Sequence, residues 1–449
     1  MLRMNNLFLV AKGELKDIGL RKKHRSFLYQ IVAAFFSKVA LAILMFFFIY
    51  NLSFSAVPSL TTGRLTILLL TGLMFTRVFI ESRQFLRANL VVLFVFGFML
   101  AHSFLLYILT GGVDSTQLSR SFHFMCYSIF GSLLFSTLLN QNLYMFLSVF
   151  SLATLIQSLF IFYSYLSPEY RLWLSELLVQ SGNIPLVFGG QVPGFSNSSG
   201  AFLSLTQALG VFSALYAARV SKSAIPNYFY GFSSLIIMAS IILTGRMGIL
   251  LASAFLILFL IANVTQRKRF MILNVATIAL LIIFLFGSRL YSIVYDYNPQ
   301  VESQINWAFE FYQHGTEAHS LKDLASQPIP PLSLETILGT GLVAGIDGLG
   351  NASGNDSGYV QTYYALGLIM AFMFYGTLLF FLLKYTYRSR DRFLLGSLVL
   401  LMFVVELKEP FIFKYVYPFF ALSVIYLSSK QKDSIELPKY KTQDLLPDL

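Results

Sequence analysis

Long apolar segments follow one another along almost the whole chain, separated mostly by short polar stretches. A helix of roughly 20 apolar residues can cross the hydrocarbon of a bilayer, which is about 30 Å thick. The pattern therefore predicts an all-α polytopic integral membrane protein, with residues 1–449 forming a single membrane domain. We identify about twelve transmembrane helices, at about 30–50, 65–80, 88–110, 122–140, 143–166, 200–218, 228–244, 247–263, 270–287, 359–384, 393–407 and 411–429.

The first of two long polar connections covers residues 167–199. It opens with Ser167 and Pro168, a pair typical of a helix start. Because its apolar residues recur at helical spacing, we expect a helix lying on the outer leaflet of the membrane or on the helix bundle, which Gly182 can end. The glycine-rich stretch 189–199 needs protein or water around it at membrane depth, so we expect it to line a cavity. The apolar stripe consists of Tyr170, Trp173, Leu174, Leu177 and Leu178.

The second long connection, residues 288–358, is the largest polar piece of the chain. It contains a short amphipathic stretch at 301–312 and ends in "LGTGLVAGIDGLGNASGNDSG", where Asp347 and Asp356 are the charged residues. Connections of this length are usually either functional or disordered. The aromatic and apolar residues within this one favour an ordered, functional loop.

The charge distribution predicts how the chain is oriented. The chain is 56% hydrophobic and 12% charged, with a formal net charge of +11, whereas soluble domains average about 25% charged residues. If the N-terminus is cytoplasmic, 23 of the 32 Lys and Arg residues fall on that side and 8 on the other. This is the positive-inside pattern. It predicts that both termini are cytoplasmic, that the two long loops lie on the opposite side, and that the basic residues need no nucleic-acid partner.

Cysteine and histidine give no sign of a metal or redox centre. The single cysteine, Cys126, lies in a predicted span and has no partner for an internal disulfide. The five histidines show no Cys/His spacing typical of a metal site. We therefore predict no metal and no cofactor.

Several charged residues are placed where the predicted helices meet the side opposite the N-terminus. Arg246 lies in the very short turn "LTGRMGILL", Arg289 follows a span, and Arg171 is on the predicted surface helix. Arginine binds phosphate through two parallel hydrogen bonds and keeps its charge at any relevant pH. Asp356 adds a carboxylate at the start of the tenth span. A lipid-linked sugar phosphate would suit this combination.

The layout resembles the bacterial O-antigen polymerases of the Wzy type and, more distantly, the O-antigen ligases. "GFSNSSGAFLSL" is similar to a Gly-aromatic-x-Asn segment that runs into a span, and "TGRMG" to an Arg-Gly turn at an outer span end. "LGTGL", followed by "NDSGYVQTYYALGLIMAFMFYG", resembles the end of the large periplasmic loop and its following span. "LKEPFIFKY" is also similar to the corresponding part of that family. The resemblance covers the topology of the whole chain, but its motifs cover about fifty residues.

The resemblance implies a glycosyltransferase of the bacterial inner membrane. It would polymerise undecaprenyl-pyrophosphate-linked repeat units on the periplasmic side, without nucleotide or metal and with a separate chain-length regulator. We expect Arg246 and Arg289, with Arg171, to contact the pyrophosphate, and Asn197 to contact the substrate. Asp356 would orient or deprotonate the acceptor hydroxyl. Tyr359 and Tyr363, together with Tyr364, would stack against sugar rings.

Two departures and several alternatives remain. Gln191 stands where the family often has a basic residue, and Asn355-Asp356 stands where the ligases place a histidine. Asp356 could instead only cap its helix, and Glu406, Lys408 and Glu409 form, most simply, a solvated cluster. The alternative functions are a flippase or transporter of lipid-linked oligosaccharides, and an O-antigen ligase.

Overall fold

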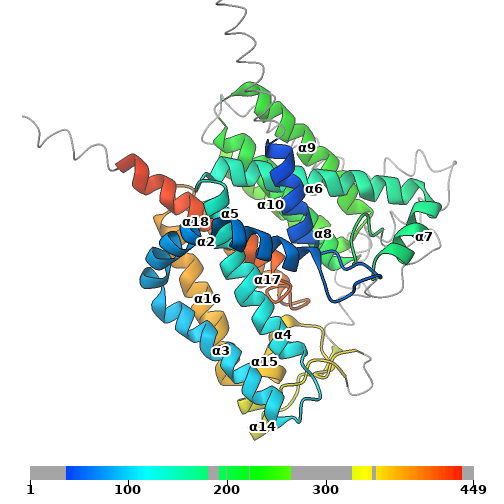
Figure 1. Cartoon of the computed structure of the whole chain (residues 1–449), viewed down its shortest axis with the longest axis vertical. Helices are drawn as coiled ribbons and strands as arrows, with labels where there is room; N and C mark the ends of the chain where they lie inside the picture. The colour runs from blue at the N-terminus through cyan, green and yellow to red at the C-terminus, as the bar shows by residue number, and fades with distance from the viewer. Residues whose placement is uncertain are drawn as a thin grey trace, which may run out of the picture.

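The computed structural model describes residues 37–179, 192–198, 200–221, 223–263, 326–345 and 350–436. Within these ranges the chain is helical, and strand-like pairing is confined to isolated bridges. In this part of the chain, seven helices are long and apolar enough to cross a membrane. The protein is therefore an α-helical, multi-pass membrane protein (Figure 1).

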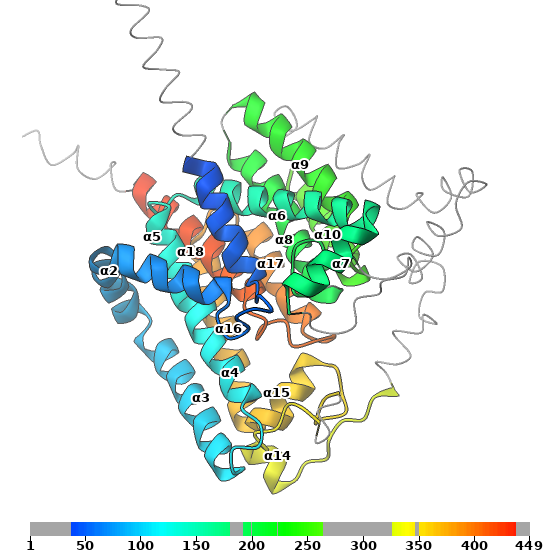
Figure 2. The ribbon, with the colours of Figure 1, turned by 45° about the vertical axis from the view of Figure 1, so that its right-hand side comes forward.

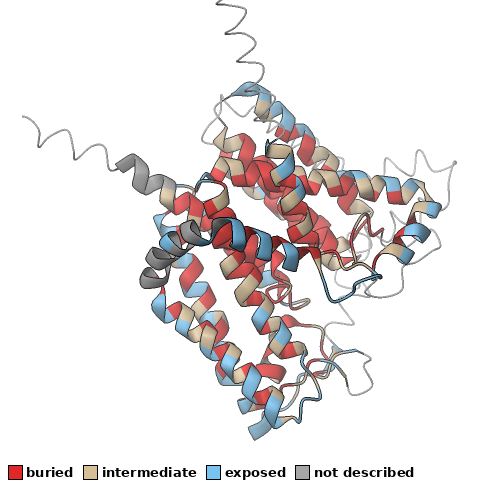
Figure 3. Ribbon diagram, in the orientation of Figure 1, coloured by how far each residue is buried: buried red, intermediate tan, exposed pale blue. Residues whose placement is uncertain are grey.

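One group of helices is built around α8 (Ala201–Val220), which packs against α6 (Leu143–Leu166), α9 (Ala224–Ile242) and α10 (Arg246–Asn263). Burial is concentrated along α8 and the neighbouring face of α6 (Figure 3). The shorter helix α7 (Pro168–Leu177) follows α6 directly. We call these helices the α8 group.

Small residues allow the helices of the α8 group to approach closely. A Cβ atom at Gly210 would lie 2.3 Å from Thr154 Oγ1 of α6, and one at Gly248 would lie 2.3 Å from the carbonyl oxygen of Ser204. Close backbone approach through small residues is a common way for membrane helices to associate. Hydroxyl and amide groups add hydrogen bonds inside the group, since Ser158 lies 3.0 Å from Ser240 and 3.5 Å from Gln207.

The second group contains ten helical segments of the described residues, long and short, in the lower and left parts of Figure 1. The helix Thr116–Leu138 is continuous but contains one π-helical segment, η1. We call these helices the α16 group. Its members are α2 (Thr62–Ala88), α3 (Leu90–Leu109), α4 (Thr116–His123), η1 (Phe124–Phe130), α5 (Gly131–Leu138), α14 (Leu334–Leu338), α15 (Gly358–Leu366), α16 (Leu368–Arg388), α17 (Arg392–Val405) and α18 (Val416–Glu436).

Most predicted spans coincide with helices. Helix α6 has the predicted bounds, and the spans predicted at about 88–110, 122–140, 200–218, 228–244 and 247–263 each match a long apolar helix. The described parts of the spans predicted at about 30–50 and 65–80 are the apolar helical segments Ser37–Tyr50 and Thr62–Leu73, the latter within α2. The span predicted at about 393–407 corresponds to α17, Arg392–Val405. Helix α18 begins at Val416, later than the predicted start at about 411. The span at about 270–287 lies outside the described residues.

The span predicted at about 359–384 is not one helix. It is divided into α15 and α16 at Gly367, whose φ of +88° is a conformation that favours glycine. The break is packed against the end of α14, because a Cβ at Gly367 would lie 2.5 Å from the carbonyl oxygen of Ile337. The apolar pattern runs unbroken across this point, so it did not reveal the interruption.

The helix predicted after Ser167 is present as α7, and its start is the predicted one. The Ser167 hydroxyl accepts a hydrogen bond from the backbone N–H of Tyr170 at 3.2 Å, with Pro168 in the first turn. The helix ends at Leu177, before Gly182, because the chain then pairs with the loop after Tyr50. There Ser55 N–H donates to the carbonyl of Leu177 at 2.9 Å.

Polar connections gather at one end of both groups, which we call the loop end. It contains the connections 51–61, 110–115, 192–198, 326–357 and 406–415. At the other end Arg219 of α8 pairs with Asp391, just before α17, at 3.1 Å. That end carries the helix termini whose flanking basic residues the charge pattern assigns to the cytoplasm. The candidate site therefore has to be sought at the loop end (Figure 2).

Candidate functional site

Asp356 lies at the loop end, two residues before α15, and it does not cap that helix. The N-cap residue is Ser357, and no side chain makes a capping bond there. One oxygen of the half-buried Asp356 carboxylate accepts from Gln327 Nε2 at 2.8 Å, and the other accepts from Asn351 Nδ2 at 2.9 Å. The interpretation of Asp356 as only a helix cap is therefore wrong. Two side-chain amides hold its carboxylate in place.

The backbone around Asp356 is fixed as firmly as its side chain. Its N–H donates to Gln327 Oε1 at 2.7 Å, so Gln327 forms hydrogen bonds with both the backbone and the carboxylate of Asp356. The neighbouring Asn355 is buried, donates to the carbonyl of Pro328 at 3.1 Å and accepts from Ser357 N–H at 2.9 Å. A carboxylate held in this way loses little further freedom when it meets a ligand, as a preorganised site requires.

Glu406, immediately after α17, is fully buried and is therefore no part of a solvated cluster, contrary to the sequence prediction. Its carboxylate accepts from the Tyr375 hydroxyl and from Ile412 N–H, both at 2.8 Å. Its backbone carbonyl accepts from Gly358 N–H at 2.9 Å, at the first residue of α15. A Cβ at Gly358 would lie 2.4 Å from Glu406 Oε1, so glycine is needed there.

Burial raises the pKa of Glu406 to about 7, because the charged form loses its hydration. The hydrogen bonds from Ile412 and Tyr375, and the positive charges of Lys414 and Arg120, oppose this effect without cancelling it. The other two members of the predicted cluster behave differently. Glu409 forms a partly exposed ion pair with Lys414 at 2.5 Å, and Lys408 is half-buried.

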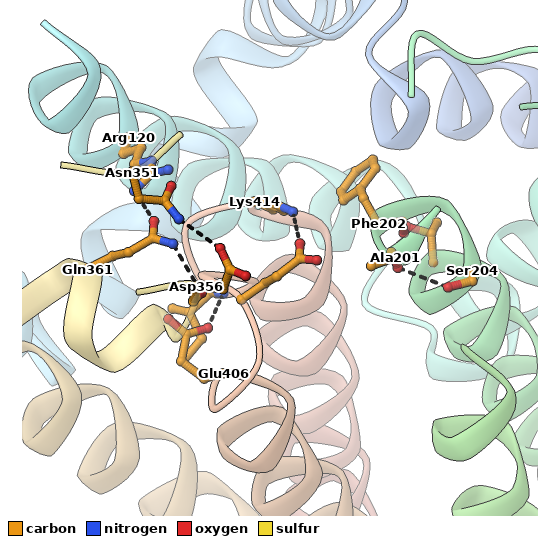
Figure 4. Close-up of polar contacts among 12 residues, drawn as sticks. Arg120, Ala201, Phe202, Ser204, Asn351, Asp356, Gln361, Glu406 and Lys414 are labelled. Carbon is orange, nitrogen blue, oxygen red and sulfur yellow. Dashed lines mark hydrogen bonds and ion pairs between the residues drawn. The ribbon is translucent and has the colours of Figure 1, made fainter. Parts of the chain in front are cut away.

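Arg120 of α4 is the cation that the described contacts bring to the Asp356 segment (Figure 4). Its Nη1 donates to Gln361 Oε1 at 3.2 Å, and Gln361 Nε2 donates to the backbone carbonyl of Asp356 at 3.0 Å. In the charge pattern of the sequence, Arg120 is one of the eight basic residues on the side opposite the N-terminus, and no role was predicted for it. Arg120 stands just before the span predicted at about 122–140, and Glu406 lies within the one at about 393–407. A charge in or beside an apolar segment is costly and often functional, so this signal could have identified both residues.

The two predicted sugar-stacking tyrosines of α15 use their hydroxyl groups within the protein. The Tyr359 hydroxyl donates to the carbonyl of Phe403 at 2.8 Å, and its ring lies 4.8 Å from the ring of Tyr375. The Tyr363 hydroxyl donates to the carbonyls of Pro330 and Pro331, each at 3.4 Å. These contacts tie α15 to α17, to α16 and to the loop before α14.

The stretch 192–198 enters the α8 group as irregular backbone covered by protein. The buried Gln157 of α6 donates to the carbonyl of Pro193 at 3.2 Å and accepts from Phe195 N–H at 3.3 Å. Gly194 has a φ of +60°, and a Cβ there would lie 2.7 Å from Gln157. A side-chain amide therefore provides the hydrogen bonds that water would otherwise supply at this depth.

Asn197 connects this stretch with the loop after Tyr50. Its Oδ1 accepts from Ser53 N–H at 2.7 Å, and its Nδ2 donates to the carbonyls of Ser53 at 2.7 Å and Val179 at 2.6 Å. These bonds give Asn197 a structural role at the loop end. The helix that precedes this loop, Ser37–Tyr50, reaches the α16 group, because the Tyr415 hydroxyl donates to the carbonyl of Phe48 at 2.9 Å.

The predicted phosphate-binding arginines belong to the α8 side of the loop end. Arg246 is the half-buried first residue of α10, beside the N-terminal turn of α8. Arg171 of α7 is 5% exposed, and desolvation lowers its pKa. Figure 4 draws Lys414 between the start of α8, marked by Ala201, and the Asp356 network. Arg289 lies outside the described residues.

The loop end therefore contains two polar halves. The α16 half holds Asp356, Arg120 and the buried Glu406, and the α8 half holds Arg246, Arg171 and Asn197. The helix Ser37–Tyr50 and the loop after it contact both halves. Comparisons with models of known protein families, with curated proteins and with solved structures give no match for this chain.

Proposed function

We propose that the protein is a membrane glycosyltransferase that polymerises undecaprenyl-pyrophosphate-linked oligosaccharide repeat units on the periplasmic side of the bacterial inner membrane. The observation that carries the proposal is the Asp356 carboxylate at the loop end, half-buried and held by the amides of Gln327 and Asn351. Arg120 supports the same segment through Gln361. A carboxylate positioned next to membrane helices suits a substrate that has a lipid anchor and a sugar hydroxyl.

In the proposed reaction, the acceptor hydroxyl oxygen forms a bond to the anomeric carbon of the donor sugar. The bond between that carbon and the pyrophosphate oxygen breaks, and undecaprenyl pyrophosphate leaves with the electron pair. The hydroxyl proton passes to Asp356, which acts as the general base. Oriented reactants and fixed positive charge lower such a barrier without a nucleotide.

The cations have different tasks in this proposal. Arg246 and Arg289 remain our candidates for the pyrophosphate, because guanidinium pairs bidentately with phosphate oxygens. Arg171 is buried within the loop end, so we propose that it stabilises α7 and does not meet the headgroup. Arg120 is a positioning residue, because it acts on Asp356 through the Gln361 amide.

The test is polymerisation by the purified, reconstituted protein. Proteoliposomes that receive a lipid-linked repeat unit should form a ladder of products on a gel. Asp356→Asn should lose at least about 100-fold in rate, the usual contribution of a general base. Glu335→Gln, which changes an exposed acid of α14 in the same long loop, should retain the ladder.

Correct folding of each variant is checked by its thermal unfolding midpoint, since Asn at position 356 cannot accept from both amide donors. A normal ladder from folded Asp356→Asn would remove this residue as the base. Repeat units that stay one unit long but cross the bilayer would indicate the flippase instead. Transfer of finished glycan to a lipid A core would indicate the ligase.

A further inference from the structure

A basic pocket lies at the end of the molecule opposite the loop end. It is a cavity of about 320 Å³, near the lower limit of small-molecule sites, which run from about 300 to 1,000 Å³. Its walls come from the ends of α8 and α10 and from the turn into α17. The residues that line it are Arg219, Ile261, Ala262, Arg390, Asp391, Arg392, Phe393 and Leu394.

One arginine of the pocket is neutralised within the protein. Arg219 Nη2 pairs with Asp391 Oδ1 at 3.1 Å, and Arg219 Nη1 donates to Asn263 Oδ1 and to the carbonyl of Ala262. The other oxygen of Asp391 accepts from the Tyr216 hydroxyl at 3.1 Å. Both carboxylate oxygens are thus used, so Asp391 balances Arg219 and leaves the other two arginines of the pocket uncompensated.

Arg390 and Arg392 are both exposed, and within the described part of the chain neither forms an ion pair. Arg392 lies over the ring of Tyr387, 4.5 Å from its centroid, a contact that directs the side chain without changing its charge. The pocket therefore has a net charge of two positive units next to a rigid Arg219–Asp391 pair. This excess of positive charge suits an anionic group such as a phosphate.

Exposed apolar side chains also line the pocket. Ile261 of α10 and Phe393 of α17 are 55% and 51% exposed, on helices that are apolar along their length. Exposed apolar side chains beside unpaired cations suit a ligand whose charged group is attached to hydrocarbon. Inorganic phosphate would contact the cations and leave these apolar side chains without a partner.

We propose that this pocket binds the headgroup phosphate of an anionic phospholipid, with the acyl chains lying along the exposed apolar sides of α10 and α17. Basic pockets between membrane helices bind acidic headgroups on the cytoplasmic side of membranes. The charge pattern assigns this end to the cytoplasm, so the site would take lipid from the inner leaflet. The proposal does not depend on the enzymatic function.

Native mass spectrometry of the purified full-length protein tests the proposal. The protein in detergent is titrated with phosphatidylglycerol, with phosphatidylcholine of the same acyl chains, and with inorganic phosphate. Phosphatidylglycerol should bind preferentially, and inorganic phosphate should not displace it. The variant Arg390→Gln/Arg392→Gln should bind phosphatidylglycerol about 30-fold more weakly, since each cation near an acidic headgroup contributes about fivefold.

The matched control is Arg64→Gln/Lys408→Gln, which removes two cations at the loop end and should leave the affinity unchanged. Equal affinity of the pocket variant and the wild type would overturn the proposal, as would equal binding of the two lipids. Displacement of the lipid by inorganic phosphate would identify the site as one for soluble phosphate. Both double variants keep the Arg219–Asp391 pair, and equal unfolding midpoints in lipid-free detergent will show that the fold is intact.

Discussion

Glu406 offers the sharpest test of the arrangement at the loop end, because its protonation should change the stability of the protein. In the folded state burial raises its pKa to about 7, from an ordinary value of 4.5. Below about pH 4.5 the group is protonated in both states and adds no penalty. As the pH rises towards 7, the unfolded chain releases this proton while the folded chain retains it. Stability therefore falls over this range.

The size of the effect follows from the difference in pKa. Each unit corresponds to about 1.4 kcal/mol, so the fully charged Glu406 costs the folded state about 3 kcal/mol above pH 7. Glu406→Gln should remove this penalty, because glutamine resembles the protonated acid. Its carbonyl can accept from Ile412 N–H, and its NH₂ group can donate to the Tyr375 oxygen. The Tyr375 hydroxyl can then donate to Thr362, 2.9 Å away.

The assay is thermal or denaturant-induced unfolding in detergent at pH 4.5 and pH 8. We expect Glu406→Gln to be more stable than the wild type at pH 8, by about 3 kcal/mol, and the two proteins to be nearly equal at pH 4.5. Glu409→Gln is the matched control, since it alters a partly exposed acid three residues away. Parallel pH profiles for the wild type and Glu406→Gln would refute the reasoning, and so would a variant that is less stable at every pH.

Three further predictions concern packing, the loop end and catalysis. Gly248→Ala should destabilise the protein by more than about 2 kcal/mol, because its methyl group would meet the Ser204 carbonyl oxygen at 2.3 Å. The control Gly376→Ala has open space around the new methyl group, so its free energy of unfolding should stay within about 1 kcal/mol of the wild type. Asn197→Ala loses three hydrogen bonds and should lower the unfolding free energy by about 2 kcal/mol; an unchanged midpoint would contradict its structural role. Arg120→Gln should slow polymerisation with a larger change in kcat than in KM, and an equal loss in both would place it in substrate binding.

The helices could be predicted from the sequence because the physical requirement is simple. A membrane helix needs a long apolar run, and α6, α8 and α10 provide such runs between clear polar limits. The break at Gly367 could not be predicted in the same way. It depends on contact with α14, which is thirty residues away in the chain, and the residues around Gly367 remain apolar.

The candidate site was predicted only in part, for a related reason. The position of Asp356 could be predicted, because it lies in a polar segment immediately before an apolar run. Its partners Gln327 and Asn351 are ordinary loop residues, and only the fold brings Gln327, 29 positions away, to the carboxylate. Burial of Glu406 is likewise a tertiary property, because the adjacent Lys408 and Glu409 suggest a solvated turn.

The two carboxylates of the α16 half cannot have the same role. Glu406 is fully buried, and its two oxygens are occupied by Tyr375 and by Ile412, so a sugar hydroxyl could reach it only by displacing part of the core. Asp356 retains exposed surface. The backbone of Glu406 accepts from Gly358 N–H, two residues after Asp356, and thereby fixes the start of α15. The accessible carboxylate is thus the one suited to meet a substrate, and the buried one is suited to holding the helix start beside it.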